Sequence, residues 1–333
     1  MTIMIDFGTS TLRIRTSKRE DTVAEASVVA RRAEGVIVAG NDALKMEGRA
    51  PQSVDITRPI EAGAIKDADA AVLLLKTVVE QNFARLAALR MPMLIALPWD
   101  LSSVEQRGME EVAHNAGAKN VKFFDSLVAA AIGADVPMDA PSGSLVVDLG
   151  AGTTEVGLLS MRGIVSARRM TRGMFGIDEE IMDAIRREYG FLVSRHAVEY
   201  VKNELLNEEK DEYEMTGRSL ATGLPCKVQV RRDVFVAPLM SHYDQVIELV
   251  RGAIETCPPE LVGDIMDKGV VLVGGGANGY RIEQALGDRI EVPVTLAQDP
   301  GSAVIRGLAK LAADENKNSG DIRHRALRML KTS

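Results

Sequence analysis

The segments Asp6-Phe7-Gly8-Thr9-Ser10 and Asp148-Leu149-Gly150-Ala151-Gly152-Thr153-Thr154 decide the fold of this chain. Each comes after a short apolar run, Ile3-Met4-Ile5 or Ser144-Leu145-Val146-Val147, that predicts a buried strand. A second strand-like segment follows each turn, at Leu12-Arg13-Ile14 and at Glu155-Val156-Gly157-Leu158. The same design therefore occurs twice, which predicts a duplicated domain with a site in the cleft between the copies.

Both turns have the composition of a phosphate-binding loop. Glycine lets backbone N–H groups approach an anion closely, and Ser or Thr hydroxyls add further donors. An aspartate repels phosphate, but it can hold a hydrated Mg²⁺ ion that bridges to the phosphates. One such motif alone is equally compatible with a plain turn. The pair, with Asp6 and Asp148 in equivalent places, predicts a clamp for Mg²⁺ and ATP.

A third glycine-rich segment, Gly274-Gly275-Gly276, leaves the apolar run Val270-Val271-Leu272-Val273. Such a segment allows a flat ligand to lie on the backbone, although a sharp strand-to-helix turn would need the same residues. Met93–Leu97 reads as another buried strand, and helical patterns lie between the strands. This alternation predicts an α/β fold. The expected helices cover residues 67–85, 103–116, 177–189 and 243–256.

Composition excludes several other classes of protein. The net charge of −7 argues against a general nucleic-acid binder, because no strong basic field is available to neutralise phosphates. Cys226 and Cys257 are the chain's two cysteines, too few for a disulfide framework, so a reducing cytoplasm is expected. No apolar run approaches the roughly 20 residues that a membrane-spanning helix needs.

Several ordered motifs make the chain resemble the MreB family of bacterial actin homologues. This family belongs to the superfamily of actin, sugar kinases and heat-shock-chaperone ATPases. The resemblance runs over nearly the whole chain. The matching segments are residues 43–51, 58–67, 104–105, 129–133, 146–148, 217–225, 257–261, 299–300 and 306–307.

The resemblance implies an actin-like fold, with two lobes built on duplicated ribonuclease-H-like domains around a nucleotide cleft. We expect a first lobe at residues 1–142 with an insertion at about 30–75, and a second at 143–311 with an insertion at about 180–250. A final helix of lobe one is expected near 301–315, with a polar linker and basic tail at 312–333. The resemblance also implies an ATP-binding filament subunit involved in cell shape and cell-wall elongation. It would lie in the cytoplasm at the inner face of the membrane, with itself, the membrane surface and morphogenesis membrane proteins as partners.

The resemblance also assigns roles to individual residues. Asp6 and Asp148 would orient Mg²⁺ and water, and Thr153 and Asp148 would contribute to catalysis. Glu199 and Lys202 would reach the ribose and adenine, although their spacing also suits a surface ion pair. The phosphates and the nucleoside would be held by Gly8, Thr9, Ser10, Gly150, Gly152, Thr153, Thr154, Gly274, Gly275 and Gly276.

The sequence departs from the family pattern at two places. The family carries Glu-Glu-Pro where this chain has Asp125-Ser126-Leu127, and its second Glu orients the attacking water. Ser126 cannot act as a carboxylate base, and loss of a positioned base costs ~10²–10⁴-fold in rate. We therefore hypothesise slow hydrolysis, or hydrolysis that depends on Asp125. Phe175 stands where the family has an aspartate, which changes the polar contacts of that loop.

Two segments are candidates for membrane contact. Phe83, Leu86 and Leu89, flanked by arginines, could enter an anionic surface, or Leu86 and Leu89 could complete the core face of the preceding helix. Ile322, Met329 and Leu330 form an apolar stripe in the basic tail, for which a disordered tail is the alternative.

The alternatives in function are a MamK-type organelle-positioning filament and a scaffold that binds nucleotide without turnover. A sugar kinase or chaperone ATPase would share the cleft but would need a larger chain.

Overall fold

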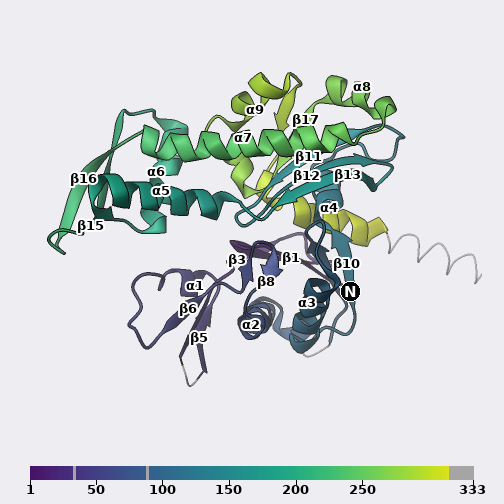
Figure 1. The fold of residues 1–333 in the computed structure, drawn as a ribbon. Helices are drawn as coiled ribbons and strands as arrows, with labels where there is room; N and C mark the ends of the chain where they lie inside the picture. Colours follow the sequence, from purple (N-terminus) through teal and green to yellow (C-terminus); the bar gives the residue numbers. More distant parts are fainter. Residues whose placement is uncertain (33–34, 88–89, 315–333) are drawn as a thin grey trace, which may run out of the picture. The chain divides into compact units, whose positions relative to one another are not determined.

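The computed structural model describes residues 1–32, 35–87 and 90–314, without the side chains of residues 36–37 and 84–87. The chain divides into two compact units (Figure 1). Unit 1 holds Met1–Pro137 together with the chain from Ser302, and unit 2 holds Met138–Gly301.

Unit 1 is built on a five-stranded sheet in the order β10-β9-β1-β2-β3. Its first three strands along the chain form an antiparallel meander, and β9 and β10 then add parallel to β1. The central strands are apolar and buried, which explains why the run Met93–Leu97 was recognisable as a strand. The bounds are β1 (Ile3–Phe7), β2 (Thr11–Thr16), β3 (Val23–Ala26), β9 (Met93–Leu97) and β10 (Val121–Asp125).

Unit 2 repeats this topology in the order β13-β12-β11-β17-β18. Again three antiparallel strands come first, and two parallel strands complete the other side. The predicted duplication is therefore confirmed, since corresponding strands occupy corresponding places in both sheets. The bounds are β11 (Ser144–Leu149), β12 (Thr154–Ser160), β13 (Gly163–Met170), β17 (Val270–Val273) and β18 (Val294–Leu296).

Each unit carries further strands and helices outside its main sheet. In unit 1 these are β4 (Val29–Arg32), β5 (Gly35–Ala39), β6 (Asp55–Thr57), β7 (Ile60–Glu61), β8 (Ala64–Ile65), α1 (Asn41–Leu44), α2 (Ala68–Ala87), α3 (Ser103–Asn115), α4 (Ser126–Gly133) and a helix over residues 303–314. In unit 2 they are α5 (Met174–Tyr189), β14 (Phe191–Leu192), α6 (Arg195–Asn207), β15 (Glu212–Ser219), β16 (Pro225–Arg231), α7 (Asp233–Glu255), α8 (Pro259–Lys268), η1 (Gly275–Asn278) and α9 (Ile282–Ile290), with η2 (Pro300–Ser302) at the boundary of the units.

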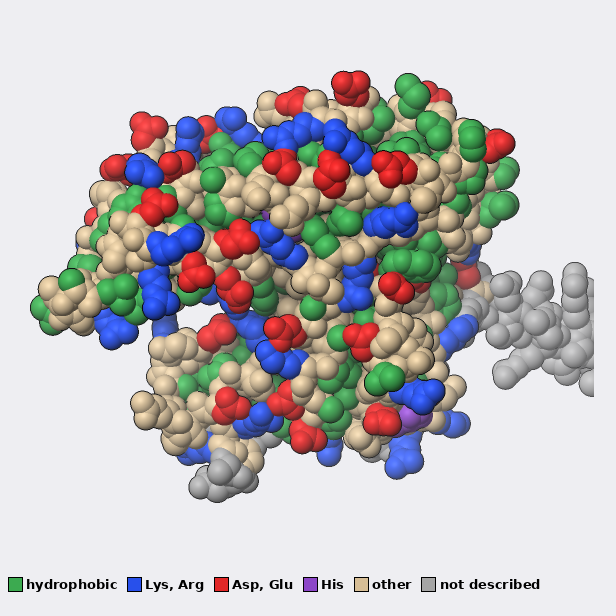
Figure 2. Space-filling view, in the orientation of Figure 1, with side chains coloured by type: hydrophobic (Ala, Val, Ile, Leu, Met, Phe, Trp, Pro, Cys, Tyr) green, Lys and Arg blue, Asp and Glu red, His purple; other side chains and the backbone are tan. Residues whose placement is uncertain are grey.

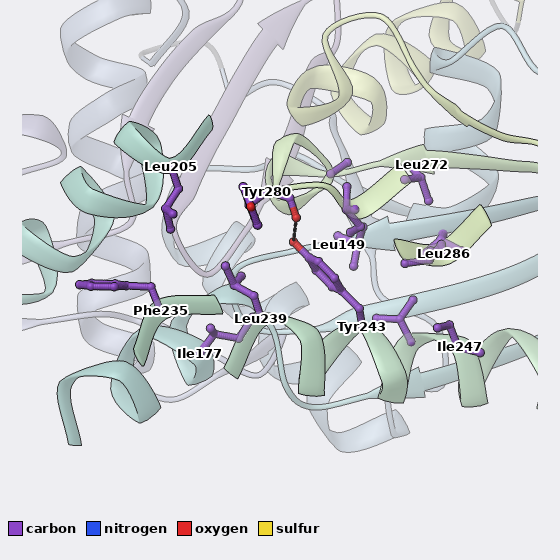
Figure 3. Close-up of a cluster of buried hydrophobic side chains, with 14 of the residues drawn as sticks. Leu149, Ile177, Leu205, Phe235, Leu239, Tyr243, Ile247, Leu272, Tyr280 and Leu286 are labelled. Carbon is purple, nitrogen blue, oxygen red and sulfur yellow. Dashed lines mark hydrogen bonds between the residues drawn. The ribbon is translucent and has the colours of Figure 1, made fainter. Parts of the chain in front are cut away.

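One face of the helix α7 contributes many residues to the core of unit 2. Its buried residues recur at three- and four-residue intervals, the spacing of one helical face. Figure 3 shows Phe235, Leu239, Tyr243 and Ile247 projecting from this face into the core. The hydroxyl of Tyr243 donates a hydrogen bond to the carbonyl of Tyr280 at 3.1 Å, which ties α7 to the segment after η1.

The bounds of α7 correct the prediction, which began this helix only at residue 243. The helix starts at Asp233 and runs through Pro238. Proline lacks the N–H that would bond to the preceding turn, but here it lies in the second turn, where only the bond back to Val234 is lost. The apolar face on both sides of Pro238 keeps the helix continuous.

The short helix α4 and the helix at 303–314 cross so closely that their point of contact has no space for a side chain. A Cβ atom on Gly133 would overlap the carbonyl oxygen of Ala303, and one on Gly307 would overlap that of Ala129. Lys310 donates from Nζ to the carbonyl of Ile132 at 3.0 Å, which satisfies a carbonyl at the end of α4. The two glycines therefore set the position of α4 within unit 1.

We predict that Gly133→Ala lowers the free energy of unfolding by about 3 kcal/mol, because the obstructing atoms are backbone and cannot rotate away. Gly263→Ala is the matched control, since a Cβ at this helical position of α8 meets nothing within 4 Å. It should raise the stability by about 0.5–1 kcal/mol. Urea denaturation of both variants measures the difference, and equal stability would contradict the close crossing.

Candidate functional site

The first glycine turn, Gly8–Thr11, joins β1 to β2. The N–H of Gly8 donates to the carbonyl of Thr11 at 3.1 Å and closes the turn. Ser27, a fully buried residue, holds the turn from outside: its hydroxyl donates to the carbonyl of Gly8 at 2.6 Å, and its N–H donates to the carbonyl of Ser10 at 2.8 Å. Thr9 and Ser10 stand half-buried at the end of this anchored hairpin.

The second turn, Gly150–Thr153, joins β11 to β12 in the same way. The N–H of Gly150 donates to the carbonyl of Thr153 at 2.9 Å. The strand pairs next to the turns are also equivalent, Phe7 with Leu12 and Leu149 with Thr154. The two hairpins thus share strand register, turn length and closing hydrogen bond.

The start of α5 fastens the second turn. The N–H of Met174 donates to the carbonyl of Gly150 at 3.1 Å, and that of Phe175 donates to the carbonyl of Ala151 at 2.9 Å. These bonds satisfy two N–H groups that a helix leaves unpaired at its first turn. Gly173 is required here, because a Cβ would lie 2.5 Å from the carbonyl oxygen of Gly150.

The two aspartates lie at the ends of equivalent strands. Asp6 lies opposite Arg13, whose guanidinium is 3.7 Å from the carboxylate. Burial raises the pKa of Asp6, and Arg13 partly opposes this shift. Asp148 is half-buried, and Gly274 (φ 85°) packs against it so closely that a Cβ would overlap the carboxylate.

The segment Gly274–Gly276 lies beside the second turn within unit 2. A Cβ on Gly276 would lie 2.7 Å from Cγ of Met174 and 2.9 Å from the carbonyl oxygen of Leu149. Gly275 is exposed and its α-carbon faces open space. Unit 2 therefore brings together Asp148, the second turn, the start of α5 and this glycine segment.

Lys202 is paired inside unit 2 with a residue that the sequence motifs did not single out. Its ammonium contacts the carboxylate of Asp178 on α5, whose side chain is only 1% exposed. Burial raises the pKa of Asp178, Lys202 opposes the shift, and the nearby Glu199 adds to it. The pattern that could have found Asp178 is its place among the buried residues of α5, one residue after Ile177.

Asp125 and Ser126 have defined places at the start of α4. Asp125 is the N-cap residue, and Oδ1 accepts hydrogen bonds from the N–H groups of Leu127 and Val128 at 2.9 and 3.4 Å. Burial is the main cause that raises its pKa, and these two bonds oppose it. Ser126 is the first residue of the helix and is 7% exposed.

Thr154 and Phe83 are placed differently from the roles expected for them. The side chain of Thr154 is fully buried and its hydroxyl donates to the carbonyl of Arg172 at 3.1 Å, so it supports the turn from inside. Phe83 is 5% exposed and belongs to the core of unit 1, with the guanidinium of Arg19 over its ring. This corrects the expectation that Phe83 contacts a membrane.

The side chains of the remaining candidates for membrane contact lie outside the described residues. Leu86 lies in α2, but its side chain is outside the described residues, as are Ile322, Met329 and Leu330. Within the described parts of the chain, no helix is both long and apolar enough to cross a bilayer. Figure 2 shows acidic and basic side chains interspersed on the visible face.

We predict that Lys202→Met lowers the free energy of unfolding by about 3–5 kcal/mol at pH 7, because it leaves the Asp178 carboxylate buried without a counter-charge. The loss should shrink as the pH falls, since the raised pKa of Asp178 lets the carboxyl become neutral in the folded state. Lys227→Met is the control, because its pair with Glu214 is exposed and such pairs contribute about 0–1 kcal/mol. Denaturant titrations at pH 7 and pH 5 test this, and equal losses in the two variants would contradict it.

Comparisons with known proteins agree with this geometry. The chain is 33% identical to the cell shape-determining protein MreB of Escherichia coli (strain K12) over 331 residues, which cover 96% of this chain and 95% of that protein. It is 31% identical to the cell shape-determining protein Mbl of Bacillus subtilis (strain 168) over 321 residues, covering 95% and 96% of the two chains.

Solved structures show the same fold. MreB5 of Spiroplasma citri bound to ADP matches with a TM-score of 0.88 at 28% identity, over 96% of this chain and 98% of that one. A MamK double helical filament matches with a TM-score of 0.78 at 19% identity, over 94% of this chain and 99% of that one. The actin-like fold predicted from the sequence is thereby confirmed. The family described as MreB/Mbl protein matches residues 1–320, and the chain belongs to this family.

Proposed function

We propose that this protein is an ATP-binding cytoskeletal subunit that assembles into filaments and takes part in determining cell shape. The observation that carries the proposal is the pair of equivalent hairpins, each closed by a glycine N–H and each preceded by an aspartate. Structures of the related Spiroplasma citri MreB5 bound to ADP and to AMPPNP support nucleotide as the ligand. The cell shape-determining relatives support the cellular role.

Asp6 in unit 1 and Asp148 in unit 2 are each the kind of residue that would hold a magnesium ion accompanying the nucleotide. Mg²⁺ keeps several waters and is held by one or two carboxylates together with substrate phosphates. Asp148 provides a carboxylate of this kind beside the second turn of unit 2, where Gly274 has no side chain that would obstruct it, and Asp6 provides one beside the first turn of unit 1. Magnesium would neutralise phosphate charge there. The protein's own groups would hold the phosphates through the backbone of the turns and the hydroxyls of Thr9, Ser10 and Thr153.

The nucleoside would lie on Gly274–Gly276 in unit 2. Gly275 offers an exposed, unobstructed backbone for a flat base. Lys202 is already paired with Asp178, so Glu199 is the member of the expected pair left for a ribose hydroxyl.

Self-association and membrane association are supported to different degrees. Filament formation follows from membership of the MreB/Mbl family, and identity of 31–33% to MreB and Mbl proteins favours this role over that of a MamK-type filament. Attachment to the inner face of the membrane is supported only by the sequence of the C-terminal segment, in which Ile322, Met329 and Leu330 stand among basic residues. Repetition of a weak anchor along a filament would strengthen it.

We expect the protein to sediment as filaments with Mg²⁺ and ATP or AMPPNP and to sediment less with ADP. Gly274→Ala should weaken ATP binding more than tenfold and abolish sedimentation, because its Cβ would overlap the Asp148 carboxylate. Gly190→Ala has a similar positive φ but meets nothing within 4 Å, so it controls for backbone strain. Sedimentation that is independent of nucleotide, or unchanged in Gly274→Ala, would contradict the proposal.

Hydrolysis is expected to be slow, because the Asp125 oxygen caps α4 and Ser126 carries no base. Ser126→Glu should raise phosphate release by filaments by ~10²–10⁴-fold, as a positioned base does. Asp125→Asn preserves an N-cap oxygen and removes the charge, so it should leave the rate unchanged. Equal turnover of the wild type and Ser126→Glu would contradict slow hydrolysis, and a loss of rate in Asp125→Asn would identify Asp125 as the base.

A further inference from the structure

His242 is a fully buried histidine on α7 that no role described above uses. Leu239, Tyr243 and Val246 surround it on the buried face of the helix. Burial lowers the pKa of His242 to about 4, and the positive charge of Arg172 contributes. The imidazole is therefore neutral at pH 7, with one nitrogen that donates and one that accepts.

The contacts of Thr154 determine which nitrogen carries the proton. Thr154 Oγ1 donates its single proton to the carbonyl of Arg172 at 3.1 Å. Nε2 of His242 lies 3.4 Å from this hydroxyl oxygen of Thr154. Because the hydroxyl proton is used, the second contact is a hydrogen bond only if Nε2–H donates to Oγ1. A relay thus runs from His242 through Thr154 to the backbone of residue 172, and such chains strengthen each bond.

The relay joins the two chain segments that adjoin the second turn. Thr154 comes directly after Gly150–Thr153, and Arg172 comes directly before Gly173, which packs against the turn. The guanidinium of Arg172 also donates to Oε1 of Gln245 on α7 at 3.0 Å and to Glu180 on α5 at 2.6 Å. Two residues about one helical turn apart on α7 therefore hold residue 172: Gln245 bonds to its side chain directly, and His242 acts on its carbonyl through Thr154.

This arrangement is not the one that stability alone would favour. Nδ1 of His242 is buried and, among the described residues, has no hydrogen-bond partner. An unpaired buried polar atom costs free energy that an apolar side chain of similar size would not. The hydrogen bond that Nε2 donates to Thr154 offsets this cost.

We propose that His242 is a positioning residue for the second phosphate loop, which acts through Thr154 and Arg172 to hold Gly150–Thr153 in the form that receives the nucleotide phosphates. The inference rests on the proposed function, because it assumes that this turn binds ATP. It adds a residue outside the turn whose role is to set the affinity for ATP.

The test measures Mg-ATP affinity by isothermal titration and stability by urea denaturation. His242→Leu removes the donor and should weaken ATP binding about five- to tenfold, the effect of one lost hydrogen bond, with no loss of stability. His242→Gln places an amide donor near the position of Nε2 and should bind within twofold of the wild type. Ser166→Ala, which removes a buried hydroxyl contact elsewhere in unit 2, should leave the affinity unchanged.

Thr154→Val removes the hydroxyl that links His242 to Arg172, so it should weaken ATP binding as much as His242→Leu does. The double variant should weaken binding no further, because both substitutions break the same relay. Additive losses in the double variant, equal losses in His242→Leu and His242→Gln, or wild-type affinity in His242→Leu would each overturn the inference. These outcomes leave the proposed function intact. A wild-type protein that fails to bind ATP would overturn the proposed function as well.

Discussion

A glycine N–H that bonds to the carbonyl three residues later closes both hairpins on which the rest of the site depends. This bond brings the ends of the two strands together, and each turn begins two residues after a strand-end aspartate. A turn of this kind needs support, because its carbonyl groups would otherwise lack partners. Ser27 provides it in unit 1, and the first turn of α5 provides it in unit 2.

The two units solve the same problem with different parts. In unit 1 a buried serine bonds to two carbonyls of the turn, and Arg13 balances the aspartate. In unit 2 the N–H groups at the start of α5 bond to two carbonyls of the turn, Gly173 allows their close approach, and the buried Thr154 bonds to the carbonyl of Arg172. Duplication therefore preserves the hairpin geometry, whereas the surrounding support is specific to each copy.

A buried ion pair joins two helices of unit 2. Asp178 and Lys202 neutralise each other between α5 and α6, and this pair fixes the two helices relative to each other. Such a pair adds little net stability but is costly to break, which makes the geometry of α6 well defined. Glu199 lies on the same helix, so its position follows from the same pair.

Much of the fold could be predicted from the sequence, because buried strands appear as apolar runs and glycine turns appear as composition. The strand Val270–Val273 was predicted with its correct bounds, and the equivalence of Asp6 and Asp148 follows from their places in the two repeated motifs. The partners of these residues could not be predicted. Ser27, Asp178 and His242 lie far from the turns in the chain or within ordinary helical patterns.

The sequence by itself determined the duplicated α/β design, the two turns and the family of this protein, since each of these can be recognised from the residues of short continuous segments. Only the tertiary structure decided that Lys202 pairs with Asp178, that Phe83 lies in the core and that Thr154 faces His242. The physical reason is that local sequence sets backbone conformation and burial tendency. The partner of a buried polar group depends on which distant segment packs against it.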